Sequence, residues 1–198
     1  QAYADARLSG RTLTARLGRQ FMYRGAVNGT FDGLSLRFRP AGGWDVQALV
    51  GLSAPVSRAL DISDWDEGGA LGLFVGRSLG ERGQVNASYF QRRRSADVAW
   101  SVAGAAFSYE VTEGGYLQSM LDYNLEQEAI QRMRHRFWYE TGKVIVSAEF
   151  GTQRPLILQD SHFAIVDVVG YSQGRAGLSY DLGPARVGYQ LILTSFEE

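Results

Sequence analysis

The sequence lacks cysteine altogether, and among its 198 residues it has only two histidines and four prolines. Without cysteine, neither a disulfide framework nor a thiolate metal site is possible. The histidines, His135 and His162, lie far apart in the sequence, so an imidazole-based metal site would need carboxylates gathered from other segments. We therefore expect neither a metal nor any other cofactor.

Long apolar runs are also missing, and so is a strong net charge. No segment approaches the roughly 18 apolar residues that a membrane-spanning helix needs, which excludes a helical membrane protein. The 20 basic and 21 acidic residues leave a formal charge of -1, and such a balance provides no bulk field that would attract nucleic acid. Nucleic acid is therefore not expected as a partner.

Glycine and aromatic residues are abundant. The chain has 24 glycines, and its 10 phenylalanines, 10 tyrosines and 4 tryptophans belong to a hydrophobic fraction of 45%. A disordered chain carries far fewer aromatic and apolar residues. We therefore expect a folded chain, and its length favours a single domain over residues 1–198.

Apolar and polar residues alternate with a period of two along most of the chain. In one segment, Leu34, Leu36 and Phe38 would share one face of a strand, with Ser35 and Arg37 on the other. The pattern recurs at residues 44–50, 70–76, 84–89, 117–125, 132–140, 175–182 and 186–193. The sequence predicts an all-β protein with about twelve antiparallel strands.

Glycine-bearing turns and longer connections are predicted to alternate between these strands. Tight turns are expected at residues 9–11, 41–43, 80–83, 112–115, 141–143 and 182–184. Longer, irregular connections are expected at residues 20–33, 54–68, 94–97, 126–130 and 155–170. About 16 residues per strand and connection exceeds the usual spacing in soluble β-sandwiches. It suits a strand of about 10 residues that crosses a bilayer at a tilt.

These features together favour an up-and-down transmembrane β-barrel. Such a barrel shows an apolar band to lipid, keeps a polar interior and has short turns at one end and longer loops at the other. The residues predicted to face lipid are Leu36, Phe38, Val46, Val85, Leu121, Val146, Leu178 and Leu191. A soluble β-barrel remains an alternative, in which the same apolar face would line a cavity for a lipid or another apolar ligand.

One short passage resembles bacterial outer-membrane β-barrel channels of the porin type. Gly18-Arg19-Gln20, a segment over residues 22–30 and Asp32-Gly33-Leu34 are similar to a strand, loop and strand of that family. The resemblance implies a location in the bacterial outer membrane, in contact with its lipid and lipopolysaccharide. It also implies passive diffusion of small hydrophilic solutes. The alternative in the same setting is a structural barrel that anchors protein partners in a larger envelope assembly for secretion or motility.

The strand count bears on the size of the barrel. With the longer connections outside, the first strand would begin and the twelfth would end on the loop side, whereas that family keeps both termini in the periplasm. We therefore expect the chain to be part of a larger barrel of 14 or more strands.

Charged residues recur on the face opposite the apolar one. Arg132, Arg134 and Arg136 follow one another at a spacing of two. The residues predicted to line a pore are Arg37, Arg39, Asp45, Asp122, Arg132, Arg134, Arg136, Glu140, Glu149, Arg175 and Arg186. They could set an internal field that favours anions. Alternatively, arginines and acids could neutralise each other and only brace the wall.

Two further motifs bear on function. Arg92, Arg93 and Arg94 end a predicted strand and could bind lipopolysaccharide phosphates, because arginine pairs with phosphate bidentately; a solvated turn is the alternative. His135 has Phe137, and not a serine, two residues further on, and His162 neighbours a serine only in sequence. A serine nucleophile needs a histidine within hydrogen-bond reach, so no enzyme is expected.

Overall fold

The computed structural model describes residues 2–8, 12–54, 64–154 and 169–197, and most of these residues lie in β-strands. A single short helix among them, α1 (Trp65–Gly68), precedes β5. The strands are β1 (Ala2–Leu8), β2 (Leu13–Arg24), β3 (Val27–Phe38), β4 (Trp44–Ser53), β5 (Gly69–Leu79), β6 (Gly83–Arg94), β7 (Asp97–Thr112), β8 (Gly115–Asn124), β9 (Ala129–Thr141), β10 (Val144–Gln153), β11 (Tyr171–Asp181) and β12 (Arg186–Phe196).

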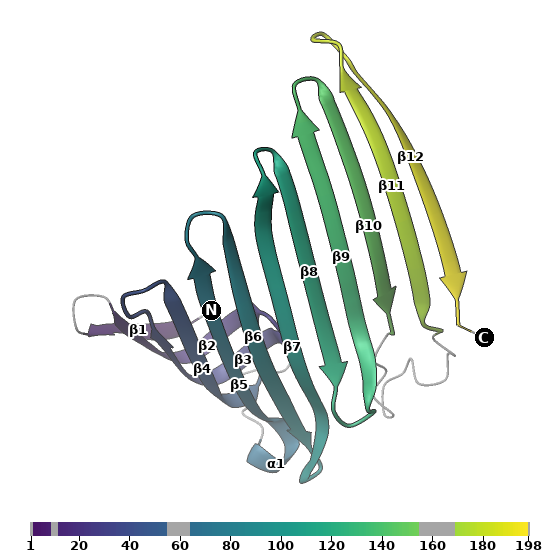
Figure 1. Cartoon of the computed structure of the whole chain (residues 1–198). Helices are drawn as coiled ribbons and strands as arrows, with labels where there is room; N and C mark the ends of the chain where they lie inside the picture. The colour runs from purple at the N-terminus through teal and green to yellow at the C-terminus, as the bar shows by residue number, and fades with distance from the viewer. Residues whose placement is uncertain (1, 9–11, 55–63, 155–168, 198) are drawn as a thin grey trace. The chain divides into compact units, whose positions relative to one another are not determined.

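The twelve strands form one antiparallel sheet in which the strand order follows the sequence, from β1 to β12. Figure 1 shows this succession clearly for β9 to β12. The prediction of an all-β fold with twelve up-and-down strands is confirmed. The sheet is not closed into a barrel, because β1 and β12 are its two edges in the part of the chain that the structure describes.

The chain forms two compact units. The first unit comprises residues 1–105 and 123–129, and the second comprises residues 106–122 and 130–198. In both units, residues that lie directly opposite each other on neighbouring strands have their side chains on the same face of the sheet.

The predicted alternation of short and long connections is only partly correct. The turns at residues 41–43, 80–83, 112–115, 141–143 and 182–184 lie between strands as predicted, whereas residues 9–11 lie outside the described residues. The predicted connection over residues 20–33 is wrong, because β2 continues to Arg24 and β3 begins at Val27. The predicted longer connections at 94–97 and 126–130 are short turns of residues 95–96 and 125–128. Only the connections over 54–68 and 154–170 are long.

Each unit has an apolar face. In the first unit Leu36 pairs with Ala48, Ala48 with Leu73, and Leu73 with Tyr89. In the second unit Val146 pairs with Tyr139 on one side and with Leu178 on the other, and Leu178 pairs with Tyr189. In each unit we call this side the apolar face.

The residues predicted to face lipid all lie on the apolar face or continue its pattern. Seven of the eight are exposed, Leu178 the most, at 54%, while Val46 is half-buried. The predicted two-sided pattern is therefore present in the structure, and contact with lipid remains a prediction.

The opposite side, which we call the arginine face, carries most of the charged residues, whereas Arg19 and Asp32 pair on the apolar face. In the first unit Arg37 pairs with Gln47, and in the second Glu149 pairs with both Arg136 and Arg175. The alternation of side chains along a strand explains this segregation, because residues two apart point the same way.

The first unit curls around its arginine face. Phe31 on β3 and Phe90 on β6 have ring centroids 5.7 Å apart. In a flat sheet, strands three positions apart would lie about 14 Å apart, so this contact requires strong curvature. The buried apolar core of the described residues lies there: Met22, Ala26, Val27, Phe31, Leu49, Ala70, Phe90 and Val102.

The turn between β2 and β3 packs into this curve. Gly25 has φ of +57°, and a Cβ there would lie 2.3 Å from Ser88 Oγ, so only glycine fits without a shift. The next residue, Ala26, donates its backbone N–H to the same Oγ at 2.9 Å. The end of the β2–β3 hairpin is thus held against β6.

Candidate functional site

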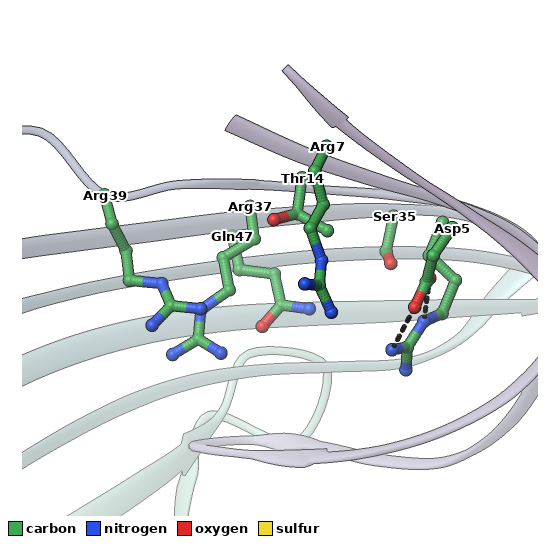
Figure 2. Close-up of a pocket in the computed structure, with 8 residues that line it drawn as sticks. Asp5, Arg7, Thr14, Ser35, Arg37, Arg39 and Gln47 are labelled. Carbon is green, nitrogen blue, oxygen red and sulfur yellow. Dashed lines mark hydrogen bonds and ion pairs between the residues drawn. The ribbon is translucent and has the colours of Figure 1, made fainter. Parts of the chain in front are cut away.

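The arginine face of the first unit contains a cavity of about 420 Å³. Its lining comes from β1, β2, β3, β4 and the residue that follows Phe38, and consists of Asp5, Arg7, Thr14, Arg16, Ser35, Arg37, Arg39 and Gln47. Four of these eight side chains are arginines and one is an acid. We call this space the first cavity (Figure 2).

Strand pairing places these side chains together. Arg7 lies opposite Thr14, Thr14 opposite Arg37, and Arg37 opposite Gln47, so one row of the sheet supplies four lining residues. The neighbouring row is two residues away on each strand and places Asp5 opposite Arg16. Polar residues at alternate positions of four consecutive strands therefore build one polar surface.

Two of the four arginines are held by carboxylates. Arg16 donates from Nε and Nη2 to the two oxygens of Asp5, at 2.7 and 3.1 Å. Arg37 donates from Nε to Asp45 Oδ1 at 2.8 Å, and Arg24 donates from Nη2 to Asp45 Oδ2 at 2.7 Å. Asp45 thus joins two arginines from different strands and fixes the Arg37 side chain at the cavity wall.

The other two arginines, Arg7 and Arg39, make no side-chain hydrogen bond or ion pair with any residue that the structure describes. Both side chains are exposed. Figure 2 shows Arg7, Arg39 and Gln47 extending into the same space. The Oε1 of Gln47 accepts a hydrogen bond from Arg24 Nη1 at 3.3 Å, which leaves the amide NH₂ as its donor.

The second unit has a cavity of about 280 Å³ on its own arginine face. It is lined by Arg132, Met133, Arg134, Arg136, Glu149, Gly151, Thr152, Gln153, Tyr171, Gln173 and Arg175. This second cavity also has four arginines and one acid in its wall.

Three of those arginines have partners. Arg132 donates from Nε and Nη2 to Asp122 at 2.9 and 2.6 Å. Arg136 donates from Nε to Glu149 Oε2 at 2.6 Å. Arg175 donates from Nε to Gln173 Oε1 at 2.7 Å. Arg134 makes no such contact with the described residues.

The structure brings together most of the predicted pore-lining residues. Arg37 and Arg39 line the first cavity, and Arg37 donates to Asp45. Arg132, Arg134, Arg136, Glu149 and Arg175 line the second, and Arg132 donates to Asp122. Glu140 and Arg186 line neither cavity, and Arg186 lies 3.6 Å from Asp181. A role in lining a pore remains a prediction for all of them.

The neutral lining residues were not predicted. Thr14, Gln47 and Gln173 lie on the arginine face at the same period of two as the charged residues. That period was the available signal, but neutral polar residues are common on any wet face and do not mark a site by themselves.

The three successive arginines at the end of β6 do not all point the same way. Along a strand, neighbours alternate, so Arg93 lies on the face opposite Arg92 and Arg94. Arg93 donates to the backbone carbonyl of Ala96 and lies 3.7 Å from Asp66 in α1. Contact of these arginines with lipopolysaccharide remains a prediction.

His135 lies on the apolar face, where its Nδ1 is 2.8 Å from Ser119 Oγ. A nucleophilic serine needs, besides a histidine, a third group that orients the imidazole and donors for an oxyanion. The structure shows only the two-residue contact, so we assign no reaction to it. Within the described ranges, no three or more His, Asp or Glu side chains are grouped so that they could hold a metal ion.

No helix in the described part of the chain is long and apolar enough to cross a membrane. Comparisons with known proteins give no family either. No family model matches the chain, and no curated protein matches it.

Proposed function

We propose that the chain forms the wall of a transmembrane β-barrel in a bacterial outer membrane and acts as a channel for passive diffusion of small hydrophilic solutes. The observation that carries the proposal is the segregation of the two faces. Leucine, valine and aromatic side chains are exposed on one face of the sheet, and most of the arginines with their acids occupy the other, the pair of Arg19 and Asp32 being an exception.

The two faces favour different surroundings. Exposed apolar area costs roughly 25 cal/mol per Å² in water, and this cost disappears against hydrocarbon. The arginine face needs water or counter-ions, because a charge that faces lipid is costly. Lipid on one side and water on the other satisfies both faces at once.

The two edge strands favour closure. Among the described residues β1 and β12 each pair with one neighbouring strand, so each has a row of backbone groups without a ladder partner there. In hydrocarbon every such group must be satisfied, which closure of the sheet achieves. We propose that the barrel closes with 14 or more strands, the additional strands lying between these two edges.

Curvature argues against a soluble barrel that binds an apolar ligand inside. Such a barrel would curl around its apolar face. The first unit curls instead around the arginine face, as the contact between Phe31 and Phe90 requires.

The charge of the two cavities supports a preference for anions. In each cavity the wall has four arginines and one acid, and the second acid nearby, Asp45 or Asp122, still leaves arginine in excess. A basic lining raises the local concentration of anions and lowers that of cations.

Conductance in planar lipid bilayers tests the channel. The protein should give ohmic conductance, and its reversal potential in a potassium chloride gradient should indicate chloride preference. Replacing Arg132, Arg134 and Arg136 together with glutamine should shift the reversal potential toward that of potassium. An unchanged reversal potential in a conducting protein would remove the anion preference.

Spin labels test whether the apolar face contacts lipid. A nitroxide at Leu178 should collide with oxygen and be shielded from a polar relaxant, and one at the neighbouring Ser179 should show the opposite pattern. Equal access to the polar relaxant at both positions would overturn the transmembrane arrangement.

A structural, anchoring barrel is the second candidate, and one observation favours it. The β2–β3 hairpin end and the apolar core fill part of the arginine face of the first unit. A barrel filled in this way would anchor partner proteins of the envelope without conducting. A complete lack of conductance in a correctly inserted protein would favour this candidate.

A further inference from the structure

We infer that the first cavity is a binding site for a small organic or inorganic oxyanion with at least two negative charges. This inference rests on the proposed exposure of the arginine face to water, and it adds a defined site where the proposed function needs only a charged wall. It does not require that the barrel conduct.

The acceptor groups in the wall of the first cavity already have partners. Asp5 is the only carboxylate in the wall, and Arg16 occupies both of its oxygens. The Ser35 hydroxyl donates to Gln20 Oε1 at 2.7 Å and is also committed. The charged acceptor of this wall is therefore already paired with an arginine.

The groups that remain are donors. Arg7 and Arg39 present two guanidinium forks without partners among the described residues, and Gln47 presents its amide NH₂. The Thr14 hydroxyl can donate as well. A ligand that satisfies this set must supply several acceptor oxygens and negative charge, which phosphate and carboxylate groups do.

The charge of the cavity wall indicates how many negative charges the ligand carries. Four arginines and Asp5 give the lining a formal charge of +3, and Asp45 and Arg24, which contact each other beside Arg37, add no net charge to it. A monovalent anion would leave part of this charge uncompensated, so a ligand with two or more charges fits better. Arg7 lies on β1 and Arg39 lies directly after β3, so two separate anionic groups can each meet one guanidinium group.

The volume of the cavity limits the size of the ligand. About 420 Å³ is at the lower end of small-molecule sites, which enclose roughly 300 to 1,000 Å³. A molecule such as pyrophosphate or citrate can enter, whereas a folded protein or a polymer could reach the cavity only with one end.

Isothermal titration calorimetry of the whole chain in detergent micelles tests the site, with pyrophosphate and citrate as probes and sucrose as a neutral control. Both anions should bind saturably, and sucrose should give no heat of binding. Arg7→Gln and Arg39→Gln should each weaken binding about tenfold, because each removes a charge-assisted contact. The probe with the lower dissociation constant would show whether the site prefers phosphate or carboxylate groups.

The control variant is Arg82→Gln. Arg82 lies in the turn between β5 and β6, is exposed and does not line the cavity, and its replacement removes the same charge. Its affinity for both anions should equal that of the unmodified chain. Arg39→Lys keeps the charge and loses the fork, so it should bind with intermediate affinity.

The outcomes separate this site from the channel. Saturable binding in micelles without any conductance in bilayers would support the site and overturn the channel. Anion-selective conductance without saturable binding would overturn the site alone. Equal losses of affinity in Arg7→Gln and Arg82→Gln would also overturn it, since they would show only a general effect of net charge.

Discussion

Arg19 lies directly opposite Asp32 in the β2–β3 ladder and donates to its carboxylate from Nε at 2.8 Å and from Nη2 at 2.6 Å. Both residues lie near the midpoints of strands of 12 residues. Their neighbours on the same side are apolar and exposed, with Leu17 at 62% and Phe21 at 52%. A bidentate ion pair therefore interrupts the apolar face of the first unit.

The stability of this ion pair indicates whether the apolar face contacts lipid or water. On a lipid-facing surface near mid-bilayer a lone arginine costs about 2 to 4 kcal/mol, whereas breaking an exposed ion pair in water typically changes stability by less than about 1 kcal/mol. Asp32→Leu should therefore lower the free energy of unfolding markedly in lipid vesicles. The double variant Arg19→Leu with Asp32→Leu should recover most of that loss. Denaturant titration of the vesicle-inserted protein measures both.

The matched control is the pair of Arg16 and Asp5 on the arginine face, which has similar bidentate geometry. Asp5→Leu leaves its arginine in water and should cost much less than Asp32→Leu. Equal losses at the two pairs would mean that both faces meet the same solvent, and the transmembrane arrangement would be wrong.

The same two strands show where sequence patterns predict the fold and where they do not. The glycines of Gly18-Arg19-Gln20 and Asp32-Gly33-Leu34 pair with each other in the β2–β3 ladder, although the sequence predicted a loop between the two motifs. At the hairpin end Val27 and Phe31 enter the core on the arginine face, while Phe21 and Tyr23 stay exposed on the other side. With apolar residues on both faces, the alternation that marks a strand disappears.

The turn between β6 and β7 was missed for a different reason. Ser95 and Ala96 both have positive φ, of 50° and 67°, and together form the whole connection. Two-residue hairpin turns of this type usually contain Asn or Gly. A turn without either residue gives no sequence signal, so its neighbours looked like an irregular connection.

The candidate site was predictable in part. The period of two identified Arg37, Arg39 and the arginines of β9, because it depends only on the strand pleat. It did not show which arginines would be neutralised. That distinction depends on strand register, which places Asp45 beside Arg37 and leaves Arg39 without a partner among the described residues.

The hairpin turn at Gly25 provides a second prediction. Gly25→Ala should destabilise the protein by about 1 to 2 kcal/mol through its positive φ and by about 1 to 3 kcal/mol more through overlap with Ser88. Gly142→Ala is the control, since Gly142 has a similar φ of +55° and open space around its Cβ position. The difference between the two losses, measured by denaturant unfolding, reports the packing of the hairpin against β6. Equal losses would contradict that packing.

The core on the arginine face provides a third prediction. Phe90 is 1% exposed and contacts Phe31 and Trp100 edge to face, with centroid distances of 5.7 and 5.4 Å. Phe90→Ala should therefore cost about 3 to 5 kcal/mol, the usual cost of truncating a buried aromatic residue. Phe150→Ala should cost clearly less, because Phe150 is exposed on the apolar face and its truncation leaves no cavity. A loss below about 1 kcal/mol for Phe90→Ala would show that this face is not packed.

The arginines of β9 give the last prediction, which separates selectivity from stability. Arg136 is paired with Glu149, whereas Arg134, two residues away on the same face, has no partner among the described residues. Arg134→Gln should change the free energy of unfolding by less than about 0.5 kcal/mol, as surface substitutions do. Because it removes an uncompensated charge, it should shift the reversal potential toward that of potassium.

The paired arginine should behave in the opposite way. Arg136→Gln leaves Glu149 without its charge partner and should cost about 1 kcal/mol, a value limited by the partial exposure of both groups. The double variant Arg136→Gln with Glu149→Gln leaves the net charge unchanged, so it should restore stability and keep the reversal potential of the unmodified protein. If this neutral double variant instead shifts the reversal potential as far as Arg134→Gln does, the paired arginines set the selectivity, and the distinction between free and neutralised charges is wrong.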